Sequence, residues 1–284
     1  MHGVVAGVDL TAVGRRVAER SRMLAETDGA WLRLVHVVEP VGEAFIAAGL
    51  ARILFEHRKR LAEELAVWVN ARSQTPVELV VVKGSPANEL CIRSHDSDLI
   101  VLGSSAVDAT KVGPVARRVA RKARRSVLIV RRQPRGPYRR VVAAVDLSEL
   151  SRAAITQAFL IAPGAEVTAV FSLPTRFDPL LADAGLFAEE VEASRSVRLR
   201  LAREAMDRFI APWEGQVKAL VVDGPPFETI DEVVRRRAAD LVTVASRGAG
   251  ATKMVLLGTV AEGLLDTVPC DVSIARVGSQ FRRP

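Results

Sequence analysis

The residues best suited to chemistry lie in one stretch, Asp240 to Thr259, with the sequence DLVTVASRGAGATKMVLLGT. It opens with an apolar run, Leu241–Val244, which predicts a buried parallel strand. A glycine-rich loop follows, and Gly258-Thr259 opens a helical pattern in which Thr259 is the predicted N-cap. Loop amides and the unpaired N–H groups of a first helical turn attract phosphate. Alone, this pattern is weak, because a plain surface turn would look the same.

A carboxylate stands where it could complete such a site. Asp146 follows a second predicted strand, 141–145, just as the glycine loop follows 241–244. Ligands of open parallel sheets bind at the carboxyl ends of the strands, where the strand order reverses. If these two strands are neighbours, one crevice receives the carboxylate, for a base or ribose, and the loop amides, for phosphates. By itself, either Asp146 or the similar Asp9 is equally a polar group over a helix start.

An internal repeat gives this site a counterpart in the first half of the chain. Four segments recur in the same order with a slowly growing offset: 4–10 with 141–147, 81–86 with 221–226, 98–103 with 240–245, and 113–116 with 258–261. The repeat predicts two domains, residues 1–133 and 138–284. The segment from Arg131 to Arg140, with its prolines and glycine, is the predicted linker.

Apolar runs and amphipathic stretches alternate in each half. The predicted strands are 4–8, 31–38, 77–82, 99–102 and 127–130, and then 141–145, 166–172, 217–222, 241–244 and 272–276. Helical patterns separate them, at 11–26, 43–71, 86–95 and 114–123 in the first half. Such alternation predicts an α/β fold of two tandem doubly wound domains, each with a five-stranded parallel sheet flanked by helices.

Composition excludes several classes of protein. The chain has 284 residues, of which 49% are hydrophobic, enough for a core in each half, and no apolar run approaches the length of a membrane span. The N-terminus lacks the pattern of a secretion signal, and Cys91 and Cys270 are too few for a disulfide framework. The four histidines have no metal-ligand spacing. We therefore expect a cytoplasmic protein without a resident metal.

The formal charge of +7 is concentrated in one segment. No acidic residue occurs between Asp108 and Asp146, where twelve are basic: Lys111, Arg117, Arg118, Arg121, Lys122, Arg124, Arg125, Arg131, Arg132, Arg135, Arg139 and Arg140. This segment is either a contact for nucleic acid or an acidic partner, or a solvated face that complements the other half. The second interpretation is favoured, because Tyr138 is the only aromatic residue among the arginines.

These motifs resemble the universal stress protein (UspA) family in its tandem two-domain form, over the whole chain. The family signature is a glycine, two residues, a glycine, nine residues, and a glycine followed by Ser or Thr. The second half keeps this spacing, with Ala245 in place of the first glycine. The resemblance implies an ATP site made of the following residues: Asp146, Ala245, Ser246, Arg247, Gly248, Gly258, Thr259 and Val260. Arg247 and Lys253 are either contacts for the outer phosphates or solvated loop charges.

Each half departs from the signature. In the second, the methyl group of Ala245 is harmless if its φ is negative, and crowds the pocket if φ is positive or a ligand must approach closely. In the first half, Gly103 remains, but Ala106 replaces the second glycine, the loop is shorter, and Gly113 is followed by Pro114. Proline removes both an N–H and a hydroxyl from the phosphate position. We therefore predict that the first half binds ATP poorly or not at all.

The resemblance implies a non-enzymatic stress-response module that binds ATP, with magnesium arriving on the nucleotide. It also implies that the halves form an internal pseudo-dimer through their last strands, 127–130 and 272–276; a further homodimer and an unknown protein partner stay open. One alternative is a nucleotide-free scaffold that uses the basic 117–140 surface. Another is a weak ATPase, or self-phosphorylation at Ser246, Thr252 or Thr259, for which the sequence offers no evident general base.

Overall fold

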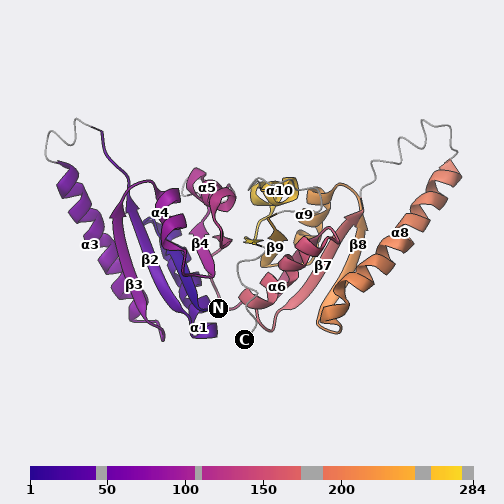
Figure 1. Cartoon of the computed structure of the whole chain (residues 1–284), viewed down its shortest axis with the longest axis horizontal. Coiled ribbons are helices and arrows are strands. Elements are labelled where there is room, and N and C mark those ends of the chain that lie inside the picture. The colour runs from indigo at the N-terminus through magenta and orange to yellow at the C-terminus, as the bar shows by residue number, and fades with distance from the viewer. Residues whose placement is uncertain (43–49, 106–110, 174–187, 247–256, 277–284) are drawn as a thin grey trace. The chain divides into compact units, whose positions relative to one another are not determined.

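The computed structural model describes residues 1–42, 50–105, 111–173, 188–246 and 257–276. The chain divides into two compact units (Figure 1). The first contains residues 1–137 together with 269–284, and the second contains residues 138–268. Of the motif residues named above, five lie outside the described residues: Ala106, Arg247, Gly248, Thr252 and Lys253.

The first unit alternates strands and helices as the sequence predicts. Its elements are β1 (Gly3–Gly7), α1 (Ala12–Asp28), β2 (Trp31–Val38), α3 (Leu50–Asn70), β3 (Val77–Lys83), α4 (Pro86–Arg93), β4 (Leu99–Gly103), α5 (Pro114–Lys122) and β5 (Ser126–Val130). The five strands are parallel in the order β3-β2-β1-β4-β5. Helices α1 and α3 pack together on the sheet, whereas α4 packs with α5. The strand order reverses between β1 and β4, which places the ligand edge of the sheet there.

The last strand of the chain belongs to the first unit. β10 (Asp271–Ala275) pairs antiparallel with β5, from Ile274 opposite Val127 to Val272 opposite Ile129. This is the pairing of final strands that the family resemblance implied. A buried carboxylate holds its start, because Asp271 Oδ1 accepts the N–H groups of Arg131 at 2.7 Å and Arg132 at 3.1 Å.

The second unit repeats the same plan. Its elements are β6 (Arg140–Val145), the 3-10 turn η1 (Glu149–Ser151), α6 (Arg152–Ile161), β7 (Glu166–Leu173), α8 (Ala188–Ile210), the 3-10 turn η2 (Ala211–Trp213), β8 (Val217–Asp223), α9 (Pro226–Arg236), β9 (Leu241–Ala245) and α10 (Thr259–Thr267). Its strands are parallel in the order β9-β6-β7-β8. The predicted fold class, two tandem doubly wound α/β domains, is confirmed.

The segment 131–140 is more than a linker. Arg131 and Tyr138 are 5% and 4% exposed, so both are buried. The backbone N–H groups of Arg139 and Arg140 donate to the carboxylate of Asp240, at 2.9 and 3.1 Å. The backbone of this segment and the side chains of Arg131 and Tyr138 therefore take part in the fold.

Candidate functional site

The candidate site of the second repeat lies where β6 and β9 end. The two strands are parallel neighbours, with Ala144 opposite Val244, so Asp146 and Ser246 emerge at the same edge. Asp146 is exposed, whereas Ser246 is 2% exposed. The condition set by the sequence, that these strands be neighbours, is met.

The loop after β6 fixes the carboxylate of Asp146. Its Oδ1 accepts the N–H of Ser148 at 3.0 Å and the hydroxyl of Ser148 at 2.5 Å. Leu147 between them has φ 60°, a left-handed conformation that is rare for a bulky residue. Ser148 also accepts the N–H of Ser151 and so caps η1. The start of the helical segment thereby sets the position of Asp146.

Ala245 fits its place without strain. It is the last residue of β9 and is 7% exposed. Its φ is not positive; among the described non-glycine residues, the positive-φ set is Leu10, Leu147 and Ala238. Positive φ at Ala245, one of the two ways in which its methyl group could crowd the pocket, is therefore excluded.

Packing requires glycine at residue 103 of the first repeat, whereas the matching residue of the second repeat is Ala245. A Cβ on Gly103 would lie 2.1 Å from Cγ1 of Val13, in the first turn of α1. The residue equally far beyond the aspartate in the second repeat is Leu150, which lies in the 3-10 turn η1 and is 36% exposed. In the second repeat α6 starts later than α1 does in the first, because the turn η1 precedes it.

The start of α10 differs from the prediction by one residue. Gly258, with φ −66° and ψ 153°, is the N-cap, and Thr259 is the first helical residue; the prediction of Thr259 as N-cap was wrong. The N-cap is defined by its extended backbone, and the carbonyl of Gly258 already accepts the first helical N–H, from Glu262 at 2.9 Å. In the part of the chain that the structure describes, no side-chain hydrogen bond caps this end. The N–H groups of Thr259 and Val260 therefore lie in an uncapped first turn.

Gly258 also leaves space that a side chain would fill. Its N–H donates to the carbonyl of Ser246 at 3.1 Å, which ties the helix start to the end of β9. A Cβ built on Gly258 would meet that same oxygen at 3.8 Å and no other described atom within 4 Å. Neither its φ nor packing against the described residues demands glycine here. The residues present fit a phosphate group.

The first repeat holds a cavity of 460 Å³ at the corresponding edge of its sheet. Asp9, His36, Ser104, Gly113 and Pro114 contribute to its lining. The sequence predicts poor ATP binding by this half and places His36 in the predicted buried strand 31–38. His36 is indeed buried, at 4% exposed, but it also lines the cavity. An apolar run in the sequence predicts a buried strand, but it does not show which of the buried residues lines a cavity.

His36 is held as a neutral imidazole. Its Nδ1 lies 2.8 Å from the carbonyl oxygen of Val8, so Nδ1 carries the proton and donates. Burial lowers the pKa of His36, and the positive charge of Arg58 lowers it further. The hydrogen bond to Val8 and the negative charge of Asp9 act in the opposite direction but do not cancel this shift. Its Nε2 is buried and has no hydrogen-bond partner among the described residues. Nε2 therefore presents an unsatisfied acceptor, which is costly in an interior.

Two other kinds of feature are absent from the described part of the chain. It contains no group of three or more His, Cys, Asp or Glu residues arranged to hold a metal ion. None of its helices is both long enough and apolar enough to cross a bilayer.

Comparison with known proteins shows the family of the chain. The sequence profile described as the universal stress protein family matches twice, over residues 1–131 and 137–276. Universal stress protein Rv2005c of Mycobacterium tuberculosis is 27% identical over 299 residues, covering 97% of each chain. A universal stress protein of Methanocaldococcus jannaschii is 27% identical over 149 residues, covering 49% of this chain and 82% of that one.

Solved structures share the fold of the whole chain. The crystal structure of a universal stress protein from Archaeoglobus fulgidus matches with a TM-score of 0.72 and 18% identity, over 97% of this chain and 98% of that one. A putative universal stress protein from Pseudomonas aeruginosa matches with a TM-score of 0.64 and 17% identity, over 97% and 93%. The chain thus belongs to the universal stress protein family, of which it carries two copies in tandem.

Proposed function

We propose that the protein is a cytoplasmic, non-enzymatic regulatory module that binds ATP, carried with magnesium, in its second repeat. The repeats are taken as 1–133 and 138–284. The proposed binding residues are Asp146, Ala245, Ser246, Arg247, Gly248, Gly258, Thr259 and Val260. Bound nucleotide would change the surface that segment 245–258 offers to a protein partner, and that change is the proposed signal.

One observation supports this proposal above the others: an exposed carboxylate and an uncapped helix start share one sheet edge. The register of β6 and β9 places Asp146 beside the end of β9, and Gly258 joins that end to α10. Asp146 would accept hydrogen bonds from the ribose or base. The N–H groups of Thr259 and Val260, together with the helix dipole, would hold phosphate oxygens. When bound, the magnesium ion would neutralise part of the phosphate charge.

Calorimetric titration with Mg-ATP tests the proposal. We expect Asp146→Ala to weaken ATP binding by about tenfold or more, because a hydrogen bond to a charged group is lost. The matched control is Asp9→Ala, the same change in the first repeat, which should leave the ATP affinity unchanged. Equal affinity for ATP in wild type and Asp146→Ala would refute the assigned site.

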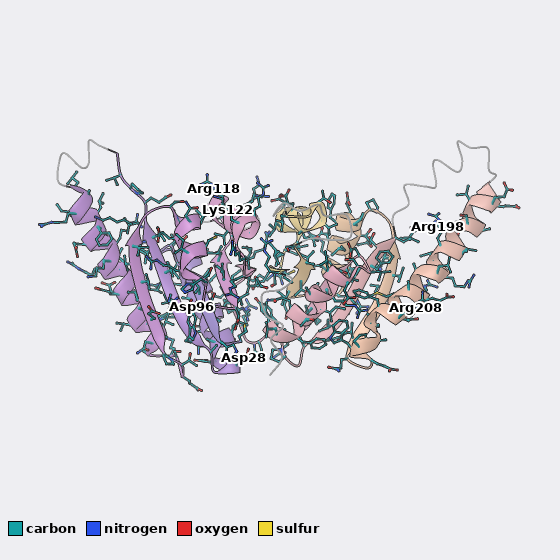
Figure 2. All side chains as sticks on the ribbon, in the orientation of Figure 1. Asp28, Asp96, Arg118, Lys122, Arg198 and Arg208 are labelled. Carbon is teal, nitrogen blue, oxygen red and sulfur yellow. The ribbon has the colours of Figure 1, made fainter. Side chains whose placement is uncertain are left out.

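The alternative function, a scaffold that uses the basic surface, has one favourable observation. Arg118, Lys122 and Arg124 are exposed, and no hydrogen bond or ion pair within the described residues engages their side chains; Figure 2 shows the first two on α5. Against nucleic acid, Tyr138 is buried and so cannot stack on a base. Native mass spectrometry of the freshly purified protein separates the two functions, because a co-purifying adenine nucleotide would exclude a nucleotide-free scaffold.

A further inference from the structure

A small pocket of the second repeat lies at the opposite end of its sheet from Asp146. Arg140 and Glu166, the first residues of β6 and β7, both line it, as does Thr168 further along β7. Arg237, just after the end of α9, lines it from the helix side. The pocket has a volume of 230 Å³. Sites for drug-sized ligands hold about 300–1,000 Å³, so this one suits a smaller molecule.

An indole ring fills the corresponding place in the first repeat. Gly3 and Arg140 are matching residues, because each directly precedes the first repeated segment. Trp31 lies opposite Gly3 on β2. Glu166 lies opposite Arg140 on β7 in the same way. A Cβ on Gly3 would lie 2.1 Å from Cε2 of Trp31, so the ring lies directly over this glycine. The ring therefore takes space that the second repeat leaves open.

A guanidinium group completes this packing in the first repeat. Cζ of Arg33 lies 4.7 Å from the centroid of the Trp31 ring. Arg33 also donates to the carbonyl oxygen of Arg93 and to the carboxylate of Asp96, both at 3.0 Å. Thr168 matches Arg33, since each lies two residues beyond the first residue of its strand. The second repeat thus has smaller side chains, and a pocket, where the first repeat has a packed ring and a cation.

Positive charge dominates around this pocket. Nζ of Lys218 donates to Oε1 of Glu166 at 2.8 Å, and Nη1 of Arg237 lies 3.7 Å from the same oxygen. Arg140 donates from Nε to the carbonyl oxygen of Ala238 at 3.0 Å. Its two Nη groups make no hydrogen bond or ion pair with the described residues. Three cations against one carboxylate favour an anionic ligand.

The rest of the lining is apolar. Val141, Val142 and Ala239 complete it. Apolar walls favour a hydrocarbon body, and a guanidinium group binds both carboxylates, by paired hydrogen bonds, and aromatic faces, by cation–π contact. The contact of Arg33 with Trp31 in the first repeat is of the second kind. A flat ring that carries one carboxylate matches both the walls and the charge.

We infer that this pocket of the second repeat binds a small aromatic carboxylate. The ring occupies the place that the indole of Trp31 fills in the first repeat. The carboxylate pairs with the guanidinium groups of Arg140 and Arg237. This inference goes beyond the proposed function and does not depend on ATP binding, because the pocket and Asp146 lie at opposite ends of the sheet.

The test is calorimetric titration of the full-length chain with indole-3-acetate, which combines the ring of Trp31 with a carboxylate. We expect one site per chain, with the same affinity in wild type and in Asp146→Ala. The two tests are therefore separate, whichever way the ATP titration turns out. The uncharged indole-3-acetamide should bind at least tenfold more weakly, because it cannot form the charged pair with the guanidinium groups.

Substitutions locate the site. Arg140→Gln should weaken the binding of indole-3-acetate by about tenfold. The matched control is Arg139→Gln, which removes the neighbouring exposed arginine and should leave the affinity unchanged, because Arg139 does not line the pocket. Combining Arg140→Gly with Glu166→Trp reproduces the first repeat. This combined variant should not bind indole-3-acetate, because the new ring fills the pocket.

Any of five results overturns the inference. Three concern the probes: no binding of indole-3-acetate, equal affinity for the amide, or loss of binding in Asp146→Ala, which would place the probe in the crevice of Asp146. Two concern the variants: equal effects of Arg140→Gln and Arg139→Gln, or binding that persists in a folded combined variant. Circular dichroism checks folding. If the combined variant does not fold, Arg140→Gln and its control decide by themselves.

Discussion

The two repeats build the same sheet edge and then equip it differently. Each places an aspartate just past its first strand, Asp9 or Asp146, and follows it with a leucine at φ 63° or 60°. In the first repeat, α1 starts at once and its Gly14 N–H binds Asp9. In the second, the turn η1 intervenes. Both repeats have therefore kept the aspartate and the left-handed leucine that follows it. They differ in where the next helix starts, and so in the groups that the carboxyl end of the sheet offers to a ligand.

The largest expected effect comes from giving the second repeat the helix start of the first. Thr259→Pro removes an N–H and a hydroxyl from the phosphate position, and proline is tolerated at the first helical residue. Each hydrogen bond to a charged group contributes about 1.5–3 kcal/mol, so the affinity for ATP should fall about a hundredfold. Calorimetric titration measures this.

Thr259→Ser is the control for that change, because it keeps both donors and should bind ATP almost as wild type does. The reverse change, Pro114→Thr, should strengthen binding of ATP by the first repeat in an Asp146→Ala background. Unchanged ATP affinity in a folded Thr259→Pro protein would show that α10 does not hold the phosphates.

A second comparison exchanges glycine and alanine at the end of β4 and β9. Gly103→Ala places a methyl group against Val13 and should lower the free energy of unfolding of the first unit by about 1–3 kcal/mol. Ala245→Gly should cost the second unit about 0.5–1 kcal/mol. Chemical denaturation followed by tryptophan fluorescence reports both, since Trp31 and Trp68 lie in the first unit and Trp213 in the second. A larger loss from Ala245→Gly than from Gly103→Ala would contradict the packing argument.

This pair also shows how far the sequence could predict the structure. Buried parallel strands appear as apolar runs, so the alternation of strands and helices was predictable from runs such as 141–145 and 241–244. Whether an alanine fits at residue 245 was not predictable, because the answer depends on where Val13 and Leu150 lie in the folded chain. The N-cap at Gly258 and the cavity beside His36 are set by backbone angles and tertiary packing, which residue types alone do not encode.

The third comparison concerns how the stability of each unit changes as the pH is lowered. The pKa of His36 is lowered in the folded protein, mainly because the ring is buried, with Arg58 adding to this and Asp9 opposing it. As the pH falls through about 6.5, His36 becomes protonated in the unfolded chain but not in the folded chain. The free energy of unfolding therefore falls as the pH drops below about 6.5. All four histidines lie in the first unit, which predicts that only this unit shows the loss.

Denaturation between pH 7.5 and 5.5 measures that loss, with Trp213 again reporting the second unit. His36→Phe should flatten the pH dependence of the first unit in this window, because the titrating group is gone. If the slope persists in His36→Phe, another group is responsible for it.

The smallest expected effects come from the hydroxyls that cap the two helical segments after the aspartates. Thr11 accepts the N–H of Val13 at 3.1 Å, and Ser148 accepts that of Ser151 at 3.2 Å. Thr11→Ala and Ser148→Ala should therefore each lower the free energy of unfolding by about 1 kcal/mol. Only Ser148→Ala should also weaken ATP binding, by a few-fold, because its hydroxyl holds Oδ1 of Asp146 at 2.5 Å. Equal effects of both changes on ATP affinity would mean that the nucleotide does not distinguish the repeats by their aspartates.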